Sequence, residues 1–285
     1  MMEFFADLPR NSLLVCGLLA GLLASLACGL IGPYVVTRRI VFLSGAIAHM
    51  AVGGIGAAVF LRELFPGAFP DPPVLAAATV AALVSAVILG LVHHHAADRM
   101  DTLIGALWAV GMAVGILLIK YCRGYQIDLM SYLFGNIALV GWSEVRLILG
   151  LNVVIGATVL AYHKRFLAIC LDQEQAELQG ISVLGTNLVL LCLVALTVIC
   201  LTQVVGLILV IALLSLPAAT AAHHVRRMGP LLVVSTLLCA VLTTVPRIAV
   251  YGTRIDPASA IVLCAGGVYL LSAVARRSFG RFRRP

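Results

Sequence analysis

The chain has 285 residues, of which 62% are hydrophobic and only 11% are charged, and its mean hydropathy is +1.11. Soluble domains carry about 25% charged residues, so this composition excludes a water-soluble globule. The apolar runs are about 20 residues long rather than short alternating stripes, which favours membrane-spanning helices over a β-barrel. We therefore predict an all-α polytopic membrane protein with one transmembrane domain over residues 1–285.

The net charge of +7 could suggest nucleic-acid binding, but the placement of the basic residues indicates membrane topology instead. Most of the basic residues fall in segments that we place on one side of the membrane: Arg38, Arg39, Arg99, Lys164, Arg165, Arg226, Arg227, Arg276, Arg277, Arg281, Arg283 and Arg284. Cytoplasmic segments are enriched in Lys and Arg, so this side, with the C-terminus, is predicted to be cytoplasmic. The basic C-terminal tail is expected to rest on anionic lipid headgroups.

The apolar runs predict nine spans, at about 12–35, 41–61, 74–93, 102–119, 144–162, 183–202, 204–222, 230–246 and 257–275. A cytoplasmic C-terminus and nine crossings place the N-terminus outside. Spans six and seven are separated only by Gln203, which predicts a tight outer turn or a broken helix there. Eight spans remain the alternative.

The connection at 120–144 is too long for a simple outer loop and too short for two more spans. Its middle, Asp128–Ile137, is predicted to form a short helix that lies at the outer surface or dips into the membrane. Irregular backbone at that depth needs protein or water around it, so this segment is expected near a pathway.

His49 lies in the middle of the second span, where an ionisable side chain is expected to face the bundle interior or water. Neutral imidazole is a common ligand of zinc-like ions, so one interpretation is transient metal contact in a pathway. The other is a packing histidine that bonds a neighbouring carbonyl. Four glycines nearby would allow another helix to approach closely: Gly45, Gly53, Gly54 and Gly56.

Residues 161–182 form the longest polar segment on the predicted cytoplasmic side. Asp172 is a good N-cap residue, Gln175 three positions later completes a capping-box pattern, and Gly180 suits the position after a helix. These signals predict a short helix at 173–179.

A helix this short is marginal in water, so packing has to support it. It is either an ordinary loop helix resting on the membrane surface or a docking element for a soluble partner. The docking interpretation uses Asp172, Glu174, Gln175, Glu177 and Gly180.

Two histidine runs lie at predicted cytoplasmic membrane edges, at 93–95 and at 223–224. Metal sensing is one interpretation. Consecutive residues of a helix point in different directions, however, which favours solvated residues without a shared role. Pro217 lies inside the seventh span, where it removes a backbone donor and kinks the helix. The kink is either a hinge for movement or a fixed bend that shapes the bundle.

Catalytic and nucleotide-binding motifs are absent from the sequence. The only lysines, Lys120 and Lys164, do not follow a glycine, so no P-loop is present. There is no H-E-x-x-H, and the eight cysteines contain no CxxC pair. We expect no catalytic residues, no bound cofactor and no energy source within this chain.

Five blocks of sequence, in order along the chain, carry a family resemblance: GPYVVTRRIVFLSGAIAHMAVGG (32–54), DTLIGALWAVGMAVGILL (101–118), DLMSYLFGNIALV (128–140), LDQEQAELQGIS (171–182) and VVGLILVIALLSLPAATAAHHVRR (204–227). Together they resemble the membrane subunits of bacterial ATP-binding-cassette importers for zinc, manganese and iron. The last block is the most specific, and 171–182 occupies the place of the family's coupling helix.

The resemblance implies a permease bundle like that of type II importers, located in the bacterial cytoplasmic (inner) membrane. It implies a homodimer, a cytoplasmic ATPase dimer that binds ATP and pushes on 171–180, and an extracytoplasmic metal-binding protein. The substrate would be a divalent metal, zinc first, with manganese or iron as alternatives. His49 would contact it in the pathway, and Asp128 and Asn136 would lie at the outer entrance. The proline of the last block, Pro217, is the candidate helix hinge from the sequence itself.

The chain departs from the family pattern at three positions. The family's aspartate four residues before the intramembrane histidine is Gly45, and its aspartate after L-F-G is Asn136. Some zinc-type members have a histidine where this chain has Ala109. The missing carboxylates leave the identity of the metal open.

Three other functions compete with this interpretation. A permease for metal chelates such as siderophores or cobalamin would need a wider pathway. A gradient-driven carrier predicts inverted repeats and interrupted helices around a midplane charge, and only His49 and the break near Gln203 fit. An intramembrane enzyme would need a second catalytic group near His49.

Overall fold

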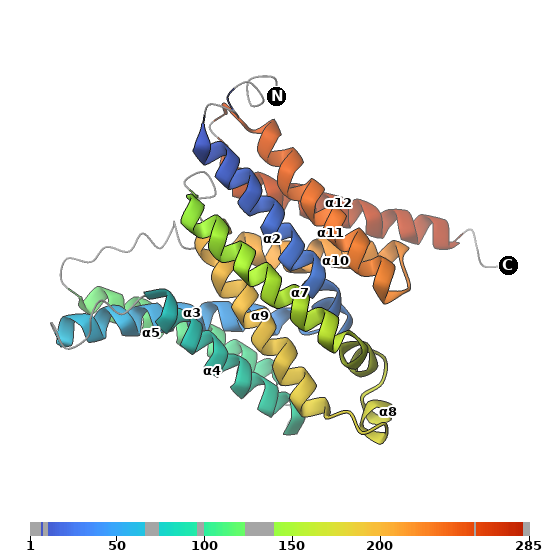
Figure 1. Ribbon diagram of the computed structural model, residues 1–285, viewed down its shortest axis with the longest axis horizontal. Coiled ribbons are helices and arrows are strands. Elements are labelled where there is room, and N and C mark those ends of the chain that lie inside the picture. Colours follow the sequence, from blue (N-terminus) through green and yellow to red (C-terminus); the bar gives the residue numbers. More distant parts are fainter. Residues whose placement is uncertain are drawn as a thin grey trace. The chain divides into compact units, whose positions relative to one another are not determined.

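The computed structural model describes residues 7, 11–65, 74–95, 100–122, 140–253 and 255–281, and its regular structure there is helical (Figure 1). The helices are α2 (Ser12–Thr37), α3 (Val41–Leu64), α4 (Val74–His95), α5 (Met100–Tyr121), α7 (Trp142–Leu171), α8 (Gln173–Leu178), α9 (Val183–Val205), α10 (Leu207–His224), α11 (Met228–Ala249) and α12 (Pro257–Arg281). Among the described residues, nine helices are long and apolar enough to cross a membrane, and only α8 is not. The predicted all-α membrane fold is confirmed.

The break between spans six and seven lies at Gly206 rather than at Gln203. α9 runs to Val205 and α10 starts at Leu207, with Gly206 between them at φ 87°. This left-handed conformation favours glycine, so Gly206 ends the first helix and turns the chain into the next. The predicted interruption is correct, but the residue that causes it was misplaced.

α7 is longer than the predicted fifth span, because it continues from the apolar segment through His163 to Leu171. At 1.5 Å per residue its 30 residues reach about 45 Å, more than the thickness of the hydrocarbon core. Phe166 and Ile169 are fully buried, so one face of this extension still packs against protein. The polar residues after 162 therefore do not end the helix as expected.

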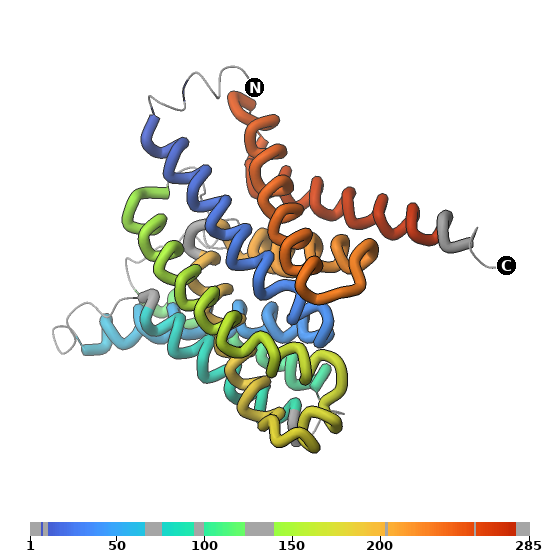
Figure 2. Tube along the Cα trace, turned by 45° about the vertical axis from the view of Figure 1, so that its right-hand side comes forward, coloured from blue at the N-terminus to red at the C-terminus, as the bar shows by residue number. Residues whose placement is uncertain are grey.

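Contacts divide the chain into two compact units. Unit 1 comprises 1–39, 130–163 and 200–285, and in it α2 packs on α10 and α11, while α12 packs on α10 and α11 (Figures 1 and 2). Side-chain hydrogen bonds join its helices: a buried one from Ser25 to Thr243 at 2.8 Å, and a partly buried one from the Asn152 amide to the Leu23 carbonyl at 3.0 Å.

Pro217 in unit 1 lies within α10 and is buried. A proline has no N–H, so the carbonyl four residues earlier, on Leu213, loses its helical partner. The thiol of Cys239 on α11 lies 3.9 Å from that oxygen and supplies a weak replacement donor. The neighbouring helix thus compensates for the proline in this structure.

Unit 2 comprises 40–129 and 164–199, and in it α3 packs against α5 and α4 (Figures 1 and 2). The predicted close approach at the α3 glycines is confirmed. A Cβ at Gly56 would lie 2.5 Å from the Gly115 carbonyl oxygen on α5, and one at Gly54 would lie 2.6 Å from that of Ala77 on α4. Small residues therefore let both neighbouring helices touch the α3 backbone.

Candidate functional site

α8, the short helix predicted in the polar segment, is present at Gln173–Leu178 with Asp172 as its N-cap. One carboxylate oxygen of Asp172 accepts hydrogen bonds from the backbone N–H groups of Glu174 and Gln175, at 3.0 and 3.3 Å. This satisfies two donors that a helix start leaves unpaired, and such a cap contributes about 1 kcal/mol. The predicted start is confirmed, and the end differs by one residue.

The end of α8 is fixed equally firmly. Gly180 has φ 78°, its N–H donates to the Glu177 carbonyl at 2.8 Å, and the Ile181 N–H donates to the Ala176 carbonyl at 3.0 Å. These two bonds define a Schellman motif, whose left-handed residue is usually glycine. A six-residue helix is therefore held at both ends by local hydrogen bonds.

Burial of α8 is strongly one-sided. Ala176 is 2% exposed and anchors the helix, whereas the other residues of α8, among them Glu174 and Glu177, are exposed. Two large apolar side chains also face outward: Leu171 just before the helix is 79% exposed and Leu178 at its end is 89% exposed. Acidic and apolar side chains are thus exposed together on and beside this short, capped helix.

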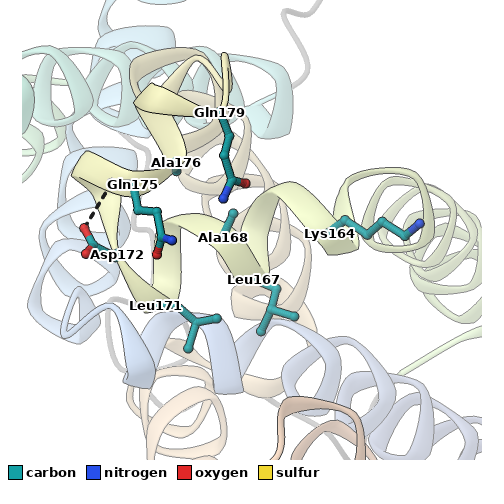
Figure 3. Close-up of a pocket in the computed structure, with 8 residues that line it drawn as sticks. All are labelled: Lys164, Leu167, Ala168, Leu171, Asp172, Gln175, Ala176 and Gln179. Atoms are coloured by element: carbon teal, nitrogen blue, oxygen red, sulfur yellow. Dashed lines mark hydrogen bonds between the residues drawn. The ribbon is translucent and has the colours of Figure 1, made fainter.

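A groove of about 230 Å³ separates α8 from the end of α7, and all of its lining belongs to unit 2. It is lined by Lys164, Leu167, Ala168, Leu171, Asp172, Gln175, Ala176 and Gln179 (Figure 3). Gln175 extends from α8 and Gln179 from the residue that follows it, while Lys164 points away from α8 along α7. Residues of α7 and residues in and around α8 thus face the same groove.

His49 on α3 is the second candidate site residue, and it is 6% exposed within unit 2. Its Nδ1 lies 2.8 Å from the carbonyl oxygen of Gly45. A carbonyl only accepts, so Nδ1 carries the proton and Nε2 keeps the lone pair that binds a metal. The hydrogen bond expected of a packing histidine is therefore present. The same bond leaves Nε2 unprotonated, which is the form that a metal ligand needs.

Trp108 on α5 is the residue that sequence reasoning missed. Its ring stands 4.5 Å from the His49 ring, and a Cβ added at Gly45 would come within 2.9 Å of it. An aspartate at position 45, as the family resemblance implies, would collide with this ring. The absence of a side chain at Gly45 therefore leaves the space that the Trp108 ring occupies beside His49.

Within the described residues, no three His, Cys, Asp or Glu side chains come together in a way that could hold a metal. The predicted outer-entrance residues Asp128 and Asn136, and the helix expected at 128–137, lie outside the described residues.

The two histidines at the end of α10 are not arranged as expected. His223 Nδ1 and His224 Nε2 lie 3.0 and 2.9 Å from the same oxygen, Oγ of Ser272 on α12. His223 is half-buried, whereas His224 is exposed. The helical argument that consecutive side chains diverge failed because both rings turn toward a residue of another helix.

The family model for the ABC 3 transport family matches residues 10–276. The chain belongs to this family. The match extends over both compact units and includes α8, His49 and the histidine pair of α10.

Known relatives match almost from end to end. A "Probable metal transport system membrane protein" of Chlamydia trachomatis is 35% identical over 94% of this chain and 90% of its own. The manganese transport system membrane protein MntC of Halalkalibacterium halodurans is 28% identical over 94% and 89%. The high-affinity zinc uptake system membrane protein ZnuB of Haemophilus influenzae is 26% identical over 91% and 96%.

Among solved structures, the PsaBC complex of Streptococcus pneumoniae with a Fab contains a similar chain. It superposes with a TM-score of 0.82 at 25% identity and covers 95% of this chain and 94% of that one. The resemblance to membrane subunits of metal importers, first drawn from five sequence blocks, is confirmed.

Proposed function

We propose that the chain is the non-catalytic membrane subunit of an ATP-driven importer for a divalent transition metal, with zinc as the preferred substrate. Both compact units together form one permease domain, and two copies form the translocation pathway in the bacterial inner membrane, with the C-terminus in the cytoplasm. The observation that carries this proposal is α8, a doubly capped helix that presents acidic and apolar side chains on a predicted cytoplasmic surface.

α8 is suited to dock into a cleft on a cytoplasmic ATPase dimer. Burying an exposed leucine contributes about 1.5–3 kcal/mol, so Leu178 and Leu171 are candidates for the apolar part of that contact. Glu174 and Glu177 supply charge that selects the partner. The caps matter because a helix that transmits movement from the ATPase to the membrane domain has to keep its shape.

The metal pathway uses His49. Nε2 of this neutral imidazole carries the lone pair that binds a metal. Imidazole suits Zn²⁺ better than Mn²⁺, which favours oxygen ligands. Gly45 removes the oxygen ligand that the family pattern implies, and Trp108 fills its space. A single imidazole releases metal readily, as a conduit requires, and an extracytoplasmic metal-binding protein delivers the ion with Asp128 and Asn136 at the entrance.

Metal competition tests the substrate. The chain is reconstituted in vesicles with its ATPase and its metal-binding protein, and ATP-dependent uptake of radioactive zinc is measured. We expect unlabelled Zn²⁺ to compete at lower concentration than Mn²⁺. Equal or stronger competition by Mn²⁺ would contradict the zinc preference, and uptake of metal only as a chelate would contradict the substrate class.

A further inference from the structure

The last turn of α10 and a point near the end of α12 meet at a cluster of three side chains in unit 1. His223 Nδ1 and His224 Nε2 lie within 3.0 Å of Ser272 Oγ, and their ring centroids are 6.5 Å apart at 74°. Ser272 is buried, and both histidines are partly accessible. Two nitrogen donors from adjacent residues thus converge on one oxygen.

The positions of the two rings are restrained from several sides. Tyr269, one turn before Ser272 on α12, stacks on His223 with ring centroids 5.4 Å apart and planes at 29°. Ser272 has a single hydroxyl proton, so only one of the two ring nitrogens can accept it. The other nitrogen can donate its own hydrogen to Oγ, so two neutral imidazoles, one accepting and one donating, can satisfy both contacts.

We propose that His223 Nδ1, His224 Nε2 and Ser272 Oγ form a second metal site that takes a late first-row divalent cation such as Zn²⁺. Zinc–nitrogen bonds are about 2.0–2.1 Å long, so two tetrahedral ligands of one ion lie about 3.3 Å apart. The two nitrogens already lie 3.0 and 2.9 Å from Oγ, close to that spacing, so a small rearrangement of the three side chains admits an ion. Water completes the coordination, because only two imidazoles converge here.

Local charge keeps this site weak. Arg276 lies one turn after Ser272 on α12 and acts on His223 electrostatically, and Arg226 and Arg227 follow the histidines in the sequence. Cations near a metal oppose its binding, so the site exchanges metal rapidly rather than retaining it.

The cluster lies at the predicted cytoplasmic end of α10, where it is placed to take up metal that has left the pathway. That role rests on the proposed function, whereas the binding itself does not. Binding can be measured without transport, so failure of the site and failure of the proposed function are distinguishable.

The first test maps protection in the unmodified full-length chain. The purified protein in nanodiscs is treated with a histidine-modifying reagent with and without Zn²⁺, and modification is read residue by residue by mass spectrometry. We expect Zn²⁺ to protect His223 and His224 but not His163, which bonds Tyr34 at 2.6 Å. Unchanged modification of the pair at millimolar Zn²⁺ would overturn the proposal.

The second test measures affinity after the other histidines that could bind zinc have been removed. The background variant carries His49→Ala with His93→Gln, His94→Gln and His95→Gln, and equilibrium dialysis is expected to find one weakly bound Zn²⁺ per chain. Adding His223→Gln and His224→Gln should weaken binding about tenfold or more.

Adding His163→Gln to the same background serves as the matched control and should leave the affinity unchanged. Unaltered thermal unfolding without metal shows that each variant is folded. Ser272→Ala, which removes the oxygen ligand and keeps both imidazoles, should bind zinc more weakly than the background but more tightly than the variant that lacks both histidines. Equal affinity with and without the pair, or an equal loss with His163→Gln, would contradict the site.

Discussion

Replacing Glu174 and Glu177 with arginine is expected to abolish stimulation of ATP hydrolysis and to prevent co-purification with the ATPase subunit. Both side chains are exposed on α8, and neither forms its caps, which are the Asp172 carboxylate and the bonds at Gly180. The helix should therefore persist while its surface charge is inverted. Like charges placed across an interface cost several kcal/mol.

The matched control for this prediction is Asp101→Arg, which inverts an exposed acidic residue at the first turn of α5 on the same predicted side of the membrane. It should leave ATPase stimulation unchanged. Leu178→Ala tests the apolar part of the contact and should weaken co-purification without changing charge. Normal stimulation of ATP hydrolysis when Glu174 and Glu177 are both replaced by arginine would refute docking at α8.

His49→Ala is expected to reduce metal uptake by about tenfold or more while membrane abundance stays the same. The substitution removes the Nε2 ligand, whereas the glycines that allow α3 and α5 to pack remain. Uptake of radioactive zinc in vesicles that contain the ATPase and ATP measures the effect, and immunoblotting measures abundance.

His163→Gln is the control for loss of a histidine elsewhere, and it should transport normally. Trp108→Phe keeps an aromatic ring beside His49 and separates loss of packing from loss of the ligand. Unchanged uptake by His49→Ala, with both controls normal, would exclude His49 from the pathway.

Local signals in the sequence predicted α8 well. Its start depends on Asp172 and its end on Gly180, and both act through hydrogen bonds within a few residues. The nine apolar helices were predictable for a similar reason, because the length of an apolar run is set by the membrane thickness. Boundaries were less accurate where the helix extends past the apolar run, as α7 does beyond His163.

Contacts between distant residues were not predictable. Trp108 fills the space beside Gly45 although 63 positions separate them in the sequence, and composition gives no hint of that contact. His223 and His224 turn to Ser272 because α10 packs on α12, which no helical periodicity reveals. The break between spans six and seven was predictable, but its position was not. Gln203 is the polar residue in that apolar run, whereas the residue with the left-handed conformation is Gly206.

The central claim is that this chain is a conduit driven by a partner, and vesicles that contain the purified chain alone test it most directly. With a proton, sodium or metal gradient and no ATPase, we predict no saturable metal accumulation, and accumulation should appear when the ATPase and ATP are added. Rapid, saturable accumulation by the chain alone under a gradient would contradict the account.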